Sequence, residues 1–155
     1  MHFEEKIQRL KLEFSSKDFK VPFTEGSDIL KSIEKEFIIV KDLTNDLNNL
    51  RQYHSNWAES MKAKIKIKSV SLTDYKSWLD KLDPNVNYWT VITLAKHYVY
   101  DCKPNSLKAL VSFWQDDFFI VDKKYNWLSY FEVDKKLQMA TVYKSGNNQI
   151  PFEIS

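Results

Sequence analysis

Glycine is scarce in this chain, because only Gly26 and Gly146 occur among its 155 residues. A P-loop and a dinucleotide-binding fingerprint each need several glycines at fixed spacing, since the backbone must approach phosphate groups closely. Neither pattern occurs in the sequence. Nucleotide-binding enzymes of these two kinds are therefore excluded, and no cofactor is predicted.

Cysteine and long apolar runs are also scarce. The single cysteine, Cys102, cannot form an internal disulfide. The first residues, MHFEEKIQRLK, lack the basic start and the continuous apolar stretch of a signal peptide. The longest apolar runs, at 37–40 and 118–121, fall far short of the roughly 18 residues that span a bilayer. We expect a soluble protein of a reducing cytoplasm that does not enter the membrane.

Arginine is nearly absent, since only Arg9 and Arg51 stand among 23 basic residues. Arginine has the planar fork that contacts guanine edges and phosphates through paired hydrogen bonds. The formal net charge of +2 also gives little general attraction to polyanions. Nucleic-acid binding is therefore disfavoured as a function.

One segment keeps the nucleic-acid alternative open. KAKIKIKSV, at 62–70, alternates basic and apolar residues with the period of a strand. This alternation predicts one face that carries four lysines, namely Lys62, Lys64, Lys66 and Lys68. Lysines at this spacing could follow a phosphate backbone, but lysines on an edge strand also prevent aggregation. We prefer the second interpretation.

Histidine occurs at three positions, His2, His54 and His97. On a strand His97 and Asp101 would point the same way, which is half of a metal site. Zinc needs three or four nitrogen or sulfur ligands, and no further cysteine or nearby histidine completes the set. We predict no metal. Cys102 would lie on the opposite face of that strand, so we assign it to the core rather than to a cysteine–histidine nucleophile.

Apolar residues at helical spacing predict three helices in the first 61 residues, over 3–15, 27–37 and 43–61. The period then changes to that of a strand over 62–70. A near capping box and Pro84 predict a helix over 72–83, and residues 88–94 and 97–101 form a candidate strand pair. A further helix of about ten residues is expected after Pro104.

The tail from 117 to 145 contains VDKK twice, twelve residues apart. Each copy follows an apolar and aromatic run, and each aspartate can accept a hydrogen bond from the backbone two residues on, as in a type I turn. Two such turns predict a three-stranded antiparallel meander. Its expected core face is formed by Tyr125, Trp127, Phe131 and Val133.

Acidic residues form the candidate binding site. Asp116 and Asp117 lie between a predicted helix and a predicted strand, and the meander would return Asp134 to the same end of the sheet. Together with Trp114 they would form an acidic edge that suits a basic partner, although the same residues could be only a solvated rim. A small hydrolase that uses these carboxylates is a further alternative, and no catalytic residue can be assigned.

Residues 89–132 resemble part of a family of small uncharacterised bacterial single-domain proteins. The shared features are WTVITL, YVYDCKPNSLKALVSFW and DDFFIVDKKYNWLSYFE, in which a strand pair, a short helix and an aromatic strand follow one another. The resemblance covers about a third of the chain and implies an immunity-type protein that neutralises a toxin. It includes no catalytic motif.

These observations lead to one fold and one preferred function. We expect a single α+β domain over 1–155, with N-terminal helices packed on an antiparallel sheet that ends in the three-stranded meander. The preferred function is a non-enzymatic protein-binding module whose partner is a protein, with a toxin as the partner that the resemblance implies.

Overall fold

The computed structural model describes residues 2–22, 26–39, 57–93 and 97–153 of the chain. Its helices are α1 (Phe3–Glu13), α2 (Gly26–Phe37), α4 (Tyr75–Leu79), α5 (Pro104–Phe113) and the 3-10 helix η3 (Pro151–Glu153). Its strands are β1 (Phe19–Lys20), β2 (Lys64–Ser71), β3 (Tyr88–Thr93), β4 (His97–Cys102), β5 (Phe118–Asp122), β6 (Leu128–Asp134) and β7 (Met139–Ser145).

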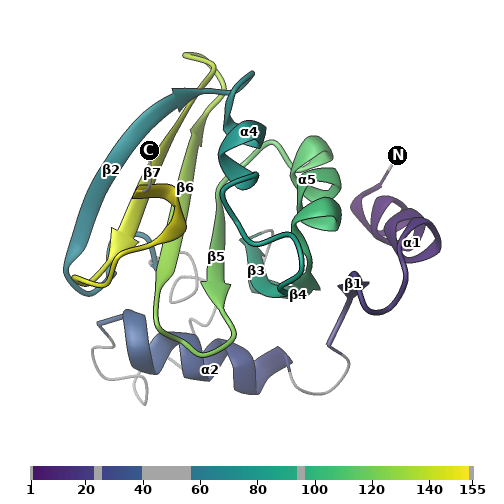
Figure 1. The fold of residues 1–155 in the computed structure, drawn as a ribbon, viewed down its shortest axis with the longest axis horizontal. Coiled ribbons are helices and arrows are strands. Elements are labelled where there is room, and N and C mark those ends of the chain that lie inside the picture. The colour runs from purple at the N-terminus through teal and green to yellow at the C-terminus, as the bar shows by residue number, and fades with distance from the viewer. Residues whose placement is uncertain (1, 23–25, 40–56, 94–96, 154–155) are drawn as a thin grey trace.

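Within these residues, seven strands form one antiparallel sheet in the order β1-β4-β3-β5-β6-β7-β2 (Figure 1). The predicted strand pair is present as β3 and β4, and β5, β6 and β7 form the predicted meander in sequence order. The described chain is therefore a single α+β domain, as the sequence predicted. None of the helices described here is long and apolar enough to cross a membrane.

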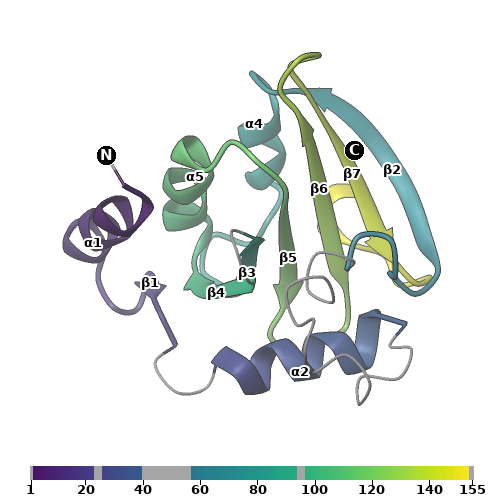
Figure 2. The same cartoon turned by 180° about the vertical axis from the view of Figure 1, so that it is seen from behind.

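The sheet is covered on both faces, which Figures 1 and 2 show from opposite sides. Successive residues of β5 point to opposite faces, so Phe118 packs in one core cluster and Phe119 in the other. The first cluster includes buried residues of α1 and α5, whereas the second includes Ile29, Ile33 and Phe37 of α2. The face covered by α2 holds the candidate site.

The two VDKK segments form the predicted turns between strands. Asp134 Oδ1 accepts hydrogen bonds from the backbone nitrogens of Lys136 and Leu137, at 3.0 and 3.1 Å. Asp122 Oδ1 instead accepts from Asn126 and Trp127, at 2.7 and 2.9 Å. In the first turn the aspartate thus accepts from residues four and five positions later, and not from the residue two positions later that the sequence predicted.

One predicted face of the meander is partly wrong. Trp127, Phe131 and Val133 belong to the first core cluster, but Tyr125 packs against the second. The cause is local, because Tyr125 has φ of 56° in the left-handed region. Such a residue interrupts the alternation of side chains and directs Tyr125 to the other face.

Two predicted helices also need correction. The predicted helix over 43–61 lies mostly outside the described residues, and its described end is not helical, since Trp57–Ser60 is a turn and Met61 forms an antiparallel bridge with Ile38. The predicted helix over 72–83 is helical only over Tyr75–Leu79. Beyond it, Lys81 and Leu82 donate to the carbonyls three residues before them, as in turns rather than an α-helix.

Candidate functional site

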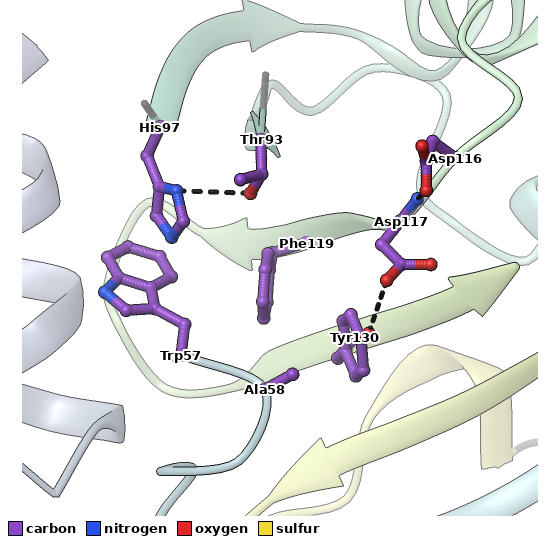
Figure 3. A pocket seen from close by; sticks show the side chains of 8 residues that line it. All are labelled: Trp57, Ala58, Thr93, His97, Asp116, Asp117, Phe119 and Tyr130. Carbon is purple, nitrogen blue, oxygen red and sulfur yellow. Dashed lines mark hydrogen bonds between the residues drawn. The ribbon is translucent and has the colours of Figure 1, made fainter. Parts of the chain in front are cut away.

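A pocket of about 180 Å³ opens on the face of the sheet that carries α2 (Figure 3). We call it the Asp117 pocket. Its lining residues come from the turn before β2, the facing ends of β3 and β4, the segment before β5, and the middle of β5 and β6. They are Trp57, Ala58, Thr93, His97, Asp116, Asp117, Phe119 and Tyr130.

Aromatic rings form the buried part of the pocket. Phe119 and Tyr130 stand directly opposite each other in the β5–β6 register, and their rings stack with centroids 4.7 Å apart. Trp57 meets the Phe119 ring edge-to-face at 5.4 Å. All three residues are buried. The antiparallel pairing of β5 and β6 thus places two of the rings, because opposite residues share one face of the sheet.

His97 and Thr93 form a second wall. These residues are paired across the β3–β4 ladder, and His97 Nδ1 lies 3.1 Å from Thr93 Oγ1 within hydrogen-bond distance. The imidazole of His97 is buried and meets Trp57 edge-to-face with ring centroids 4.2 Å apart. Cys102, at the other end of β4, is buried in the cluster on the opposite face, as the sequence predicted.

The carboxylate of Asp117, which lines the pocket, accepts two hydrogen bonds from residues of β6. Its Oδ2 accepts a hydrogen bond of 2.8 Å from Tyr130 Oη, and its Oδ1 accepts one of 2.8 Å from the backbone nitrogen of Val133. The β5–β6 ladder ends at the pair Phe118 and Phe131, so β5 offers no backbone acceptor to Val133. The Asp117 carboxylate accepts the hydrogen bond from the Val133 backbone nitrogen instead.

The surroundings of Asp117 change its acidity in opposite directions. Burial raises the pKa of the carboxyl above its ordinary value, while the hydrogen bonds from Val133 and Tyr130 and the charge of Lys64 lower it in part. The net pKa is raised. The carboxyl is therefore held by donors that favour its charged form in a place that disfavours charge.

Asp116 lies at the exposed mouth of the pocket, where its Oδ1 accepts a 2.8 Å bond from the backbone nitrogen of Asp117. Trp114 does not line the pocket, but its Nε1 donates a 3.0 Å bond to the carbonyl oxygen of Asp117 and so fixes the backbone there. Asp134 does not line it either, because its carboxylate accepts bonds within its own turn. Two of the four predicted binding residues therefore line the pocket, and a third supports it.

Sequence reasoning missed most of the remaining lining residues. The pairing of Phe119 with Tyr130 follows from the predicted meander once its register is known. The meeting of His97 with Thr93 follows similarly from the strand pair. No sequence signal brings Trp57 to this place, because it reaches the sheet by a tertiary contact after a long segment of chain.

The four lysines of 62–68 do not share one face. The β2–β7 pairing has a bulge between Lys66 and Lys68, which inserts one residue and reverses the alternation beyond it. Lys64 Nζ lies 4.4 Å from the Tyr143 ring centroid on the pocket face, whereas Lys68 Nζ lies 5.5 Å from the Trp78 ring, which packs against the other core cluster. The expected single face of lysines is thus wrong, which weakens the nucleic-acid interpretation.

Two of these lysines donate hydrogen bonds to backbone carbonyls, and one of these carbonyls belongs to the lining residue Ala58. Lys62 Nζ donates to Lys35 O at 2.8 Å, and Lys64 Nζ donates to Ala58 O at 2.9 Å. Lys64 therefore places a positive charge beside the Asp117 pocket.

The described residues contain no group of three or more His, Cys, Asp or Glu side chains arranged to hold a metal ion. Comparisons of the chain with protein-family models, with curated proteins and with solved structures give no match. The geometry of the Asp117 pocket and its surroundings is therefore the feature of the molecule that bears on function.

Proposed function

We propose that the chain is a non-enzymatic protein-binding module, of the toxin-neutralising immunity type that residues 89–132 resemble, and that it docks its partner over the Asp117 pocket. The observation that carries this proposal is the combination of buried aromatic walls with an acidic, exposed mouth at Asp116. Binding sites of proteins commonly combine an apolar centre with a charged rim.

The size of the pocket favours a binding surface over a substrate site. Pockets for complete small-molecule ligands usually enclose roughly 300 to 1,000 Å³, whereas this one encloses about 180 Å³. A single side chain of a partner protein is a suitable occupant for this space. The remaining contact area would come from the surrounding surface.

The bonding of Asp117 also favours binding over carboxylate chemistry. A hydrolytic pair needs one carboxyl to exchange a proton with the substrate. Both oxygens of Asp117 already accept bonds from groups that hold β6 in place. This carboxylate therefore has a structural role, which a catalytic proton transfer would disturb.

The partner would be neutralised by surface coverage, with the aromatic centre as the anchor and the acidic mouth guiding a basic surface toward it. The test uses the immobilised chain to capture proteins from an extract of the source cells, followed by purification of the captured protein. Its affinity is then measured by calorimetry for the wild type and for the Asp116→Lys variant.

We expect Asp116→Lys to weaken binding at least tenfold, because the exposed charge at the mouth is reversed. Glu13→Lys is the matched control, since Glu13 is exposed at the end of α1 on the other layer and the change in net charge is the same. A partner that binds both variants as tightly as the wild type would show that the Asp117 pocket is not the docking site.

A further inference from the structure

The Asp117 pocket has a more specific chemistry than a general docking surface. Two carboxylates, of Asp116 and Asp117, stand at one end of a hollow whose other walls include the rings of Trp57, Phe119 and Tyr130 (Figure 3). Aromatic rings carry negative charge on their faces and attract cations. Carboxylates and rings together favour a positively charged group and disfavour an anion.

The local charges favour a cation. The carboxylates of Asp116 and Asp117 line the pocket and a third carboxylate, of Glu34, accepts a 3.3 Å bond from Trp57 Nε1, whereas the ammonium group of Lys64 is the positive group described beside it. Lys64 Nζ cannot fill the hollow itself, because it is held over the Tyr143 and Tyr130 rings at 4.4 and 5.3 Å and donates to Ala58 O. A further positive group would therefore reduce the excess of negative charge around the pocket.

The burial of the rings selects the kind of cation. Trp57, Phe119 and Tyr130 pack directly on one another and are each no more than 3% exposed, so a group that enters the hollow beside them must lose much of its water. A guanidinium is more weakly hydrated than an ammonium, is planar, and stacks on aromatic faces. It is therefore the cation that this hollow accepts at the lowest desolvation cost.

The carboxylates have remaining capacity for a guanidinium. Each carboxylate oxygen offers two lone pairs, and the described bonds use one at Asp116 Oδ1 and one at each oxygen of Asp117. A guanidinium presents five N–H donors in a planar fork, which suits oxygens that stand close together at one end of a pocket.

We infer that the Asp117 pocket binds the guanidinium group of an arginine side chain presented by the partner protein. This inference rests on the proposed protein-binding function and names the chemistry of the partner at its anchor. An arginine at the centre of an interface is among the residues that commonly contribute most to affinity.

The test titrates the full chain, labelled with ¹⁵N, with N-acetyl-arginine methylamide and follows the amide and indole signals by NMR. Three further probes are the citrulline, lysine and norleucine analogues. Citrulline has nearly the shape of arginine without its charge, so it separates charge from shape. We expect saturable shifts at pocket residues with arginine, with a Kd of about 1 to 10 mM, as suits a small fragment.

The citrulline and norleucine analogues should produce no saturable shift, and the lysine analogue should bind at least threefold more weakly than arginine. Asp116→Asn should weaken arginine binding at least threefold, while Glu13→Gln should leave it unchanged. Equal shifts with citrulline, equal affinity for lysine, or arginine binding unaffected by Asp116→Asn would each overturn the inference.

The outcomes also separate this inference from the protein-binding function. If arginine fails to bind while the captured partner still loses affinity for the Asp116→Lys variant, the pocket is a docking site with another occupant. If arginine binds as expected while Asp116→Lys leaves partner affinity unchanged, the pocket accepts a guanidinium but the partner docks on a different surface, which overturns the inference that the partner presents the arginine there.

Discussion

Tyr130 Oη donates a 2.8 Å hydrogen bond to Asp117 Oδ2 and ties the middle of β6 to the residue just before β5. The second oxygen of the same carboxylate accepts from the backbone nitrogen of Val133, which lies two residues beyond Phe131, where the β5–β6 pairing ends. One side chain thus organises the wall of the pocket and the end of the meander.

Replacement of Asp117 should therefore affect stability. We expect Asp117→Ala to lower the free energy of unfolding by about 2 to 4 kcal/mol, because two donors lose their acceptor and each unsatisfied buried group costs about 1 to 3 kcal/mol. Tyr130→Phe removes one of the two bonds together with its donor and should cost about 1 kcal/mol. Urea denaturation measures both, and equal stabilities of Asp117→Ala and the wild type would contradict this role.

The acidity of Asp117 predicts a pH dependence of stability. Burial raises its pKa above the ordinary 3.8, so the native state binds this proton more tightly than the unfolded state. The contribution of the group to stability is then fully present below the unfolded pKa and is lost as the pH rises through the folded pKa. Asn at this position does not titrate.

The stability of the wild type relative to Asp117→Asn should consequently fall as the pH rises from about pH 3 to about pH 7. Urea denaturation of both proteins across this range gives the difference at each pH. A difference that grows with pH would mean that the hydrogen bonds outweigh burial and that the pKa is lowered.

The two VDKK turns should differ in their importance. We expect both Asp122→Ala and Asp134→Ala to cost about 0.5 to 2 kcal/mol, as for other local side-chain caps, with the larger effect at Asp122. Asp122 positions Trp127, which is 8% exposed in the core, whereas Asp134 positions Leu137, which is 71% exposed. Denaturant melts test the order, with Lys124→Ala and Lys136→Ala as controls, and the reverse order would contradict it.

Cys102 should be chemically inert in the native protein. Burial raises the pKa of its thiol to about 12, even though contacts with Thr90 and Ser106 lower it in part. Because the thiolate is the reactive form, we expect no labelling by a thiol reagent at pH 8 until denaturant is added. A Ser112→Cys variant gives an exposed comparison on α5. Rapid labelling of Cys102 in the native wild type would show that its strand opens.

The lysines of 62–68 should not support strong nucleic-acid binding, because the bulge divides them between two faces. We expect the protein to bind generic DNA or RNA no more tightly than about 10 μM at physiological salt. Fluorescence anisotropy with labelled oligonucleotides tests this. Submicromolar, salt-sensitive binding that is lost when Lys66 and Lys68 are both changed to Gln would favour the nucleic-acid alternative.

Local patterns in the sequence were sufficient to predict much of the fold. The apolar spacing around Ile7 and Leu10 predicted α1, and the two aspartate turns predicted the meander. Both features depend on residues close together in the chain, where side-chain period and turn chemistry decide the conformation.

Features that depend on distant contacts were not predictable in this way. The bulge near Ile67 changes which face the later residues of β2 occupy, and the left-handed φ of Tyr125 turns its side chain in the turn before β6 to the other face. The alternation of residue types in the sequence shows neither change. The candidate site was found only in part for the same reason. Asp116 and Asp117 are neighbours in sequence, whereas Trp57 joins them only through the packing of the turn before β2.

The positions of β1 and β2 have a consequence for the order in which the chain can fold. Both strands precede their sheet neighbours in the sequence, and they occupy opposite edges of the sheet, beside β4 and β7. A ribosome therefore releases β2 well before β7 exists, and β2 must remain unpaired during much of synthesis. Its lysines and its bulge are features that keep an unpaired strand from joining another chain. Since local hairpins close faster than long loops, we expect the sheet to grow outward from β3, β4 and the meander, with the earliest strands added last.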